Sequence, residues 1–324
     1  MSTEKVMQTP KEERPVVLEV KDLSKTFVLK KRGRKLVTHA IDHNSFKVYE
    51  GETFGLVGES GCGKTTTGRT IIRLYKPDSG SIILKGRDIS GPMTKELRKY
   101  ITSNVSMIFQ DPVDSLNPRM TVQEIIEEGL TVRGMKDKEE RQRLVYDILD
   151  RVGLTKEHAT RYPHEFSGGQ RQRIGIARAL VVNPSIIIAD EPVSALDVSI
   201  QAQIINLLNQ LKKEMNLTVI FIAHNLSVVK YFSDRIAVMY YGKIVELTEA
   251  KELYLHPLHP YTKSLLSAVP EPNPLTERDR KRISYDPKAA HDYSSEQPRM
   301  QEVVPGHFVY CSDSELERYR EELK

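Results

Sequence analysis

The sequence of 324 residues has no tryptophan and only two cysteines, Cys62 and Cys311. Two cysteines cannot build the disulfide framework of a small secreted domain, so a reducing cytosol is the expected compartment. No apolar run approaches the roughly 20 residues that a membrane-spanning helix needs. The first residues, 1–14, are polar and mixed in charge, unlike a secretory signal. These absences predict an intracellular protein without a membrane span of its own.

Neither sign of charge is in large excess, because 48 lysines and arginines face 44 aspartates and glutamates, for a net charge of +4. Such a balance is compatible with contact to anionic surfaces but does not require nucleic acid as a partner. Hydrophobic residues make up 39% of the chain and charged residues 28%, as in soluble globular proteins. The length predicts one large domain with an extension, or two domains.

The most informative stretch is Gly58–Thr65, which fits the pattern G-x-x-x-x-G-K-[ST] at every position. Thr53–Val57 before it is short and apolar, as expected of a buried strand, and Thr66–Leu74 after it predicts a helix. Strand, glycine-rich loop and helix are the context in which this pattern binds phosphate. The helix residues predicted to face inward are Ile71, Ile72 and Leu74.

The chemistry of this phosphate loop follows from its residue types. Glycines let backbone N–H groups surround an anion, and the helix N-terminus adds the positive end of its dipole. Lys64 is expected to reach the β- and γ-phosphates of ATP, and the Thr65 hydroxyl to bind Mg²⁺. The residues of this stretch expected to contact the nucleotide are Gly58, Glu59, Ser60, Gly61, Cys62, Gly63, Lys64, Thr65 and Thr66.

The stretch before the phosphate loop predicts strands. Val16–Val20 is expected to be a first strand, with Lys25–Leu29 as its partner, and Ile41–Val48 is expected to be another strand. For the basic stretch Lys30–Lys35, a solvated hairpin tip is the favoured interpretation, and contact with lipid headgroups or phosphate is the alternative. Phe27 is an isolated aromatic residue here, and by itself the sequence favours packing over stacking on a purine.

Two short runs after the loop helix, Ser81–Leu84 and Arg87–Ile89, predict a hairpin. The apolar run Val105–Phe109 predicts a strand that ends at Gln110. A polar residue in that place is as typical of a strand end before a turn as of a binding site, so Gln110 alone decides nothing.

From about Thr121 to Val182 the apolar residues recur at helical spacing, which predicts a helical insert, about 113–182, in an α/β chain. The insert contains Phe-Ser-Gly-Gly-Gln, in which Ser167 and Gln170 form a capping box for the helix that follows. A well-capped helix after a glycine turn is the simpler interpretation. The alternative is a second helix N-terminus prepared for an anion.

A run of three isoleucines and an alanine ends in Asp190 and Glu191, as expected of a strand buried on both faces of a parallel sheet. Ligands bind beyond the carboxyl ends of such strands. Asp190 is therefore placed to hold Mg²⁺ opposite Thr65, and Glu191 to orient and deprotonate an attacking water. A further apolar strand ends in His224, which is expected at the same sheet edge, near the γ-phosphate.

In combination these motifs resemble those of ABC-type ATPases, over about residues 16–250. The resemblance implies an α/β fold: a P-loop ABC-type nucleotide-binding domain with an antiparallel β subdomain and a helical subdomain, after a flexible N-terminus at 1–15. The signature here is Phe-Ser-Gly-Gly-Gln, where Leu-Ser-Gly-Gly-Gln is commoner. The ordered set is Gly58–Thr65, Gln110, Ser167–Gln170, Asp190–Glu191, Ser194–Asp197 and His224.

The resemblance also implies a composite site, in which two such domains pack head to tail around ATP. Phe27 matches the aromatic residue that stacks on adenine, and Gln110 matches the residue that contacts Mg²⁺ or water and couples the site to a transmembrane subunit. The helical subdomain is where that subunit docks. The residues expected to act on a partner's nucleotide are Ser167, Gly168, Gly169, Gln170 and Asp197.

The C-terminal stretch, 251–324, narrows the family. Residues 251–270 resemble the start of the C-terminal extension of oligopeptide and dipeptide permease ATPases. Residues 299–309 resemble the end of the F-type subunit of that group. This implies a second, D-type ATPase as heterodimer partner, two transmembrane permease subunits and, indirectly, an external peptide-binding protein. The chain would then lie peripherally on the cytoplasmic face of the membrane, with ATP and Mg²⁺ as ligands and no nucleic acid.

One departure concerns metal. Many relatives carry several cysteines in this extension, where an iron–sulfur cluster can bind, but Cys311 stands alone after residue 250. One thiolate cannot supply four ligands, so no cluster is expected. His256 and His259 lie in a proline-spaced stretch that favours a turn over a metal site. The segment 275–302 is rich in charge and proline and is expected to order only against a partner.

Two other functions remain as alternatives. A soluble ABC-type ATPase acting on DNA or ribosomes would be expected to carry coiled-coil or zinc-binding inserts, or two ATPase domains in one chain. A nucleotide-gated clamp that barely hydrolyses ATP would be expected to lack Glu191 or His224. Because the sequence has both residues and shows no such insert, an ATPase that powers a peptide importer is the leading hypothesis.

Overall fold

The computed structural model describes residues 14–31, 34–269 and 282–324. Nearly all of the N-terminal segment expected to be flexible, 1–15, lies outside these ranges, as does the first part of the segment 275–302. Of the basic stretch Lys30–Lys35, only the last side chain is described. Within the described ranges, every helix is too short or too polar to cross a membrane.

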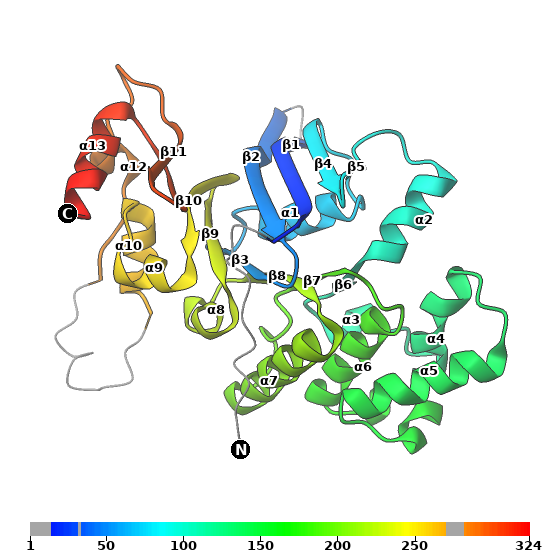
Figure 1. Cartoon of the computed structure of the whole chain (residues 1–324). Coiled ribbons are helices and arrows are strands. Elements are labelled where there is room, and N and C mark those ends of the chain that lie inside the picture. The colour runs from blue at the N-terminus through cyan, green and yellow to red at the C-terminus, as the bar shows by residue number, and fades with distance from the viewer. Residues whose placement is uncertain (1–13, 32–33, 270–281) are drawn as a thin grey trace.

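A large sheet runs through the middle of the molecule (Figure 1). Five of its strands are parallel and carry the phosphate loop and the two apolar runs that end in acids and in histidine. The other three are antiparallel and close one edge. In spatial order the strands are β11 (Arg299–Val304), β12 (His307–Cys311), β10 (Lys243–Glu249), β9 (Arg235–Tyr240), β3 (Thr53–Val57), β8 (Thr218–Ala223), β7 (Ile186–Asp190) and β6 (Val105–Ile108).

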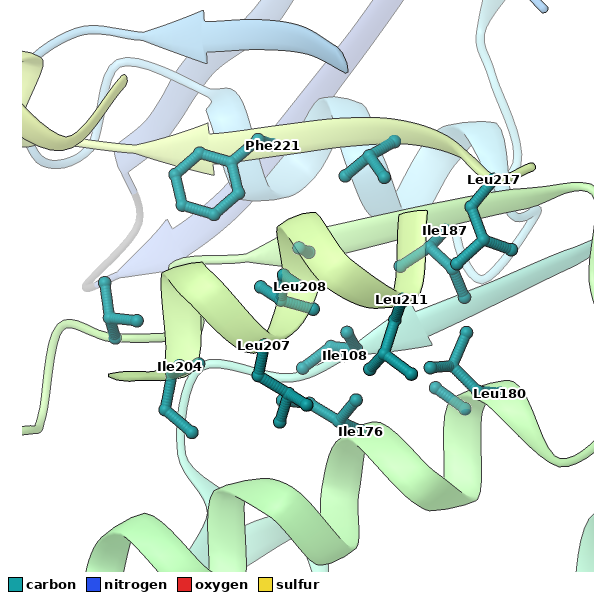
Figure 2. Packing of buried hydrophobic residues seen from close by; sticks show 14 of the residues in the cluster. Ile108, Ile176, Leu180, Ile187, Ile204, Leu207, Leu208, Leu211, Leu217 and Phe221 are labelled. Carbon is teal, nitrogen blue, oxygen red and sulfur yellow. The ribbon is translucent and has the colours of Figure 1, made fainter. Parts of the chain in front are cut away.

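The central strands are buried on both faces, as their continuous apolar sequence predicted. Alternate residues of β7 enter two different cores: Ile187 packs with the helices, and Ile186 packs toward the second sheet. Figure 2 shows the first of these cores, where Leu208 and Leu211 of α7 (Val198–Met215) lie between the strands and α6 (Gly168–Leu180). Because both faces of these strands are packed, the carboxyl ends of the strands, where the site lies, are held in place.

The second sheet is antiparallel and corrects one prediction. Val16–Val20 and Lys25–Leu29 are not two paired strands but parts of one strand, β1 (Val16–Lys31), which pairs with β2 (Arg34–Tyr49). Register irregularities between Val20 and Thr26 let β1 bend without a chain reversal. The sheet is completed by β4 (Ser79–Leu84) and β5 (Arg87–Asp88), the predicted hairpin.

Helix α1 (Lys64–Ile71) follows the phosphate loop, as predicted, but it is shorter than expected. The backbone of Arg73 takes a left-handed conformation (φ 62°), which ends the helical path. Leu74 therefore does not face inward and is 60% exposed. That part of the prediction was wrong, whereas Ile71 is buried as expected.

The region from 121 to 182 is helical, as its periodicity predicted (Figure 1). Ser167 and Gln170 form the predicted capping box of α6. A helix that lies between β5 and β6 in the chain, α2 (Lys95–Asn104), was not predicted. The other helices here are α3 (Pro112–Ser115), α4 (Val122–Val132) and α5 (Lys138–Arg151), with 3-10 turns at Lys156–Thr160 and Pro163–Glu165.

The C-terminal stretch packs on the edge of the main sheet (Figure 1). Its hairpin, β11–β12, continues that sheet, because β12 pairs with β10 at Glu246↔Val309 and Leu247↔Phe308. The last stretch of chain is therefore hydrogen-bonded to the main sheet and not merely attached by a linker. The remaining helices are α8 (Leu226–Phe232), α9 (Ala250–Leu255), α10 (Pro260–Ser267), α12 (Pro287–Ala290) and α13 (Asp313–Glu322).

Candidate functional site

A pocket of about 880 Å³ opens at the carboxyl ends of β3, β7 and β8. The phosphate loop forms one wall, and the β1–β2 hairpin contributes Phe27 to another. Ten of the expected site residues line this one cavity, whereas Gly58, Glu59, Cys62 and Asp190 lie outside its lining. The pocket is lined by Phe27, Thr38, Ala40, Ser60, Gly61, Gly63, Lys64, Thr65, Thr66, Gln110, Asp111, Glu191, Ser194, Ala195 and His224.

The shape of the phosphate loop depends on its glycines. Gly63 precedes α1 with φ 112°, and a Cβ atom at this residue would lie 2.0 Å from the carbonyl oxygen of Ala40. No other residue type fits this close approach. Within the described residues, no side chain caps the N-terminus of α1, so its first N–H groups are left facing a pocket suited to an anion.

Lys64 lies under the loop with its side chain 3% exposed. Its ammonium group donates to the carbonyl oxygens of Gly58 and Glu59, each at 2.8 Å, and lies 3.9 Å from Oε1 of Glu191. These partners hold the charge at the base of the pocket. A phosphate in the pocket would compete with the two carbonyl oxygens for the same cation.

Asp190 and Thr65 meet across the sheet edge, as expected. The Thr65 hydroxyl donates to Oδ1 of Asp190 at 2.8 Å. Asp190 is fully buried, and burial raises the pKa of its carboxyl group. Its second oxygen, Oδ2, has no hydrogen-bond partner among the described residues. A buried, unpartnered carboxylate oxygen beside a hydroxyl fits a small, hard cation such as Mg²⁺.

Glu191 is the point on which two other predicted residues converge. Its Oε2 atom lies 2.9 Å from Nδ1 of His224 and accepts from Nε2 of Gln110 at 3.3 Å. The Glu191 backbone is left-handed (φ 44°), and its N–H donates to the carbonyl oxygen of Ile222 in the neighbouring strand. Such a conformation costs on the order of 1–3 kcal/mol and is typical of functional sites.

Ser167–Gln170 and Asp197 do not line the pocket, but they lie near one another. A Cβ atom at Gly169 would lie 2.7 Å from Ile200 in the first turn of α7, and Asp197 is the residue before that helix. Ser167 and Gln170 cap α6 reciprocally, by Ser167 N–H to Gln170 Oε1 (3.0 Å) and Gln170 N–H to Ser167 Oγ (3.3 Å). Both helix N-termini thus lie outside the lining of the chain's own pocket.

The two cysteines are buried, and the two histidines His256 and His259 have local partners. Cys62 is buried inside the loop, and burial raises the pKa of its thiol. Cys311 is buried in β12, and burial raises the pKa of its thiol to about 12. His256 pairs with Glu252, and His259 accepts from the N–H of Tyr261 at the start of α10, so the geometry favours a turn. The described ranges contain no group of three or more His, Cys, Asp or Glu side chains that could hold a metal ion.

Some residues of the pocket were missed by sequence analysis. Thr38 lies directly opposite Phe27 in the β1–β2 register, and Ala40 follows two residues later on the same strand face. Only a correct pairing of the two strands could have found them. Asp111 follows Gln110 in the chain and could have been suspected from that position alone.

The fold and this site define a class, that of ABC transporter ATP-binding cassettes. The ABC transporter family matches residues 41–194. Among solved structures, a dimeric post-hydrolysis state of the ATP-binding cassette MJ0796, bound to ADP and Pi, superposes with a TM-score of 0.65 at 30% identity. The match covers 72% of this chain and 98% of that one. The predicted fold class is confirmed.

A narrower family is shown by the C-terminal region and by whole-chain relatives. Residues 245–295 match the C-terminal region of oligopeptide/dipeptide transporters. The oligopeptide transport ATP-binding protein OppF of Bacillus subtilis is 56% identical over 94% of this chain and 98% of its own. The dipeptide transport ATP-binding protein DppF of Lactococcus lactis is 53% identical over 94% and 96%. The chain belongs to the oligopeptide and dipeptide transport ATP-binding proteins, as its sequence motifs predicted.

Proposed function

We propose that this chain is the ATP-hydrolysing subunit that powers import of oligopeptides or dipeptides by an ABC transporter. The observation that carries the proposal is the convergence of His224, Gln110 and Lys64 on Glu191, beside a phosphate loop and within one pocket. Family membership supports it, because the relatives are named for oligopeptide and dipeptide transport.

In this mechanism the chain's own residues bind, orient and deprotonate. The loop N–H groups and Lys64 hold the β- and γ-phosphates, and Phe27 stacks on the adenine at the far wall of the pocket. Glu191 accepts a proton from the attacking water, while His224 positions both that carboxylate and the γ-phosphate. Thr65 and Asp190, with Gln110 nearby, would hold Mg²⁺, which neutralises the charge that develops on the phosphates.

The exposed N-termini of α6 and α7 are proposed to complete a second nucleotide site on a partner cassette. Ser167–Gln170 and Asp197 lie outside the chain's own pocket, which supports action in trans. The partner is proposed to be a D-type ATPase, and each cassette would dock on one of two permease subunits through its helical region, about 113–182. An external peptide-binding protein would deliver the cargo, with this chain on the cytoplasmic face of the membrane.

A pull-down from detergent-solubilised membranes, followed by a peptide-stimulated ATPase assay, tests the function. Recovery of two multi-span proteins and a second ATPase, with stimulation by peptides, is the expected result. Recovery of ribosomes or nucleic acid without a membrane subunit would favour the soluble ATPase instead. A complex that forms but does not respond to peptides would support the assignment as a transporter subunit and refute peptides as the cargo.

The composite site is tested separately by photolabelling the assembled complex with 8-azido-ATP under conditions without turnover. Ser167→Arg should lower labelling of the partner ATPase and leave labelling of this chain near the wild-type level. The matched control is Lys64→Ala, which should lower labelling of this chain first. If Ser167→Arg weakens labelling of its own chain as strongly as that of the partner, the two sites are not composite.

A further inference from the structure

One peptide group of the phosphate loop, the one between Gly58 and Glu59, is held from both sides. Its carbonyl oxygen, on Gly58, accepts from the Lys64 ammonium at 2.8 Å. Its N–H, on Glu59, donates to the hydroxyl of Tyr261 at 3.2 Å. Tyr261 belongs to α10, about two hundred residues further along the chain, in the stretch that follows the last strand of the cassette. A side chain from the C-terminal stretch therefore touches the phosphate loop directly.

The Tyr261 ring has a fixed place. The side chain is buried, and its ring lies 4.4 Å from that of Tyr240 in β9 and 5.5 Å from that of Tyr285, centroid to centroid. Its own N–H donates to Nδ1 of His259, which caps α10. The hydroxyl is thus delivered to the loop by a helix whose start and whose ring contacts are both defined.

The residues just before α10 are hydrogen-bonded to the main sheet. Glu246 of β10 is fully buried and accepts from the backbone N–H groups of Leu258 (2.9 Å) and His259 (3.0 Å). The same carboxylate lies 2.7 Å from Nε2 of His307 in β12. Because the position of α10 depends on both strands, the hairpin β11–β12 and the phosphate loop are linked by an unbroken series of contacts.

We infer that Tyr261 is a positioning residue for the phosphate loop, through which the C-terminal stretch sets the affinity of the chain for ATP. The inference rests on the proposed function, since it takes this loop to be the ATP site. Tyr261 does not line the pocket and is not assigned a role in the chemical step.

The partners of Lys64 change when phosphate binds. Its ammonium group now bonds the carbonyl oxygens of Gly58 and Glu59, and binding of phosphate draws it away from them. The Tyr261 hydroxyl is then the side-chain contact that keeps the Glu59 N–H turned away from the pocket. A loop already held in this orientation loses less conformational freedom when ATP binds, so its affinity is higher.

Hydrogen exchange on the wild-type full chain gives a first test that needs no variant. Although Glu59 is exposed, its amide should exchange more slowly than those of the next two loop residues, Ser60 and Gly61. Equal exchange at all three amides would overturn the inference, because the Tyr261 contact would then not persist in solution.

The second test compares Tyr261→Phe with the matched control Tyr285→Phe. The control removes a hydroxyl from the same aromatic cluster, where it lies 3.1 Å from Nε2 of His291, without touching the loop. Tyr261→Phe should raise the Kd for ATP by about 2- to 10-fold, the worth of one hydrogen bond. In the assembled transporter KM for ATP should rise by a similar factor, with kcat within about twofold of wild type.

These experiments distinguish failure of the role inferred for Tyr261 from failure of the proposed function. Equal effects of Tyr261→Phe and Tyr285→Phe on the Kd for ATP would mean a general structural role and would overturn the inference, as would no effect of Tyr261→Phe. Hydrolysis by wild type together with either result leaves the proposed function standing. A wild-type complex that neither binds nor hydrolyses ATP would instead remove the function itself.

Discussion

The sharpest prediction concerns Glu191→Gln. The amide is nearly isosteric with the carboxylate, and its oxygen can still accept from Gln110 or His224, whose donor atoms lie 3.3 and 2.9 Å away. Fold and pocket should therefore persist. What the substitution removes is a group that can take a proton from water, and a positioned general base contributes about 10²–10⁴-fold in rate. The hydrolysis step should slow by that factor, which corresponds to about 3–5 kcal/mol in activation free energy.

Binding of ATP should respond differently from turnover. Glu191 lies 3.9 Å from the Lys64 ammonium, and its neutralisation leaves that cation freer to meet phosphate. The Kd for ATP should hence stay equal or fall, and a closed, ATP-bound dimer should accumulate and be visible by size-exclusion chromatography. The control is Glu50→Gln, the same change at an exposed glutamate outside the pocket. Single-turnover hydrolysis by Glu191→Gln at the wild-type rate would refute the assignment of Glu191 as the base.

Three further predictions follow from the same geometry. Lys64→Ala should weaken ATP binding by about 10- to 100-fold, because a buried cation that can bond phosphate is lost, and a fluorescence titration with unchanged Kd would contradict this. A bulky maleimide on Cys62 should block ATP binding, and since burial raises the pKa of this thiol, labelling should be slow at pH 7 and speed up as pH rises. ATP should protect against this reagent, and Cys62→Ala should resist it; sensitivity that survives in Cys62→Ala would point to another target. Without Mg²⁺, Asp190→Asn should raise Tm at pH 7–8, because a carboxyl whose pKa is raised by burial costs stability while it is charged. The gain should vanish as pH falls and Asp190 becomes neutral in wild type, whereas a gain independent of pH would exclude this explanation.

The sequence by itself determined the features that depend on neighbours along the chain. The phosphate loop, its flanking strand and helix, and the capping box at Ser167 and Gln170 are local patterns of residue type and spacing. The buried strand that ends in Asp190 and Glu191 is equally local, because a continuous apolar run needs cover on both faces wherever it lies. Their order along the chain was enough to indicate the family, as the comparisons confirm.

Only the tertiary structure decided how distant segments meet. β1 continues through its irregular region as one strand because it pairs with β2 along its length. The same register places Thr38 beside Phe27. The order of the parallel strands brings Gln110 and His224 to the same oxygen of Glu191. The contact of Tyr261 with the phosphate loop joins residues about two hundred positions apart in the chain. No local pattern encodes such contacts, because they depend on which strand lies next to which, and that is settled by packing of the whole chain.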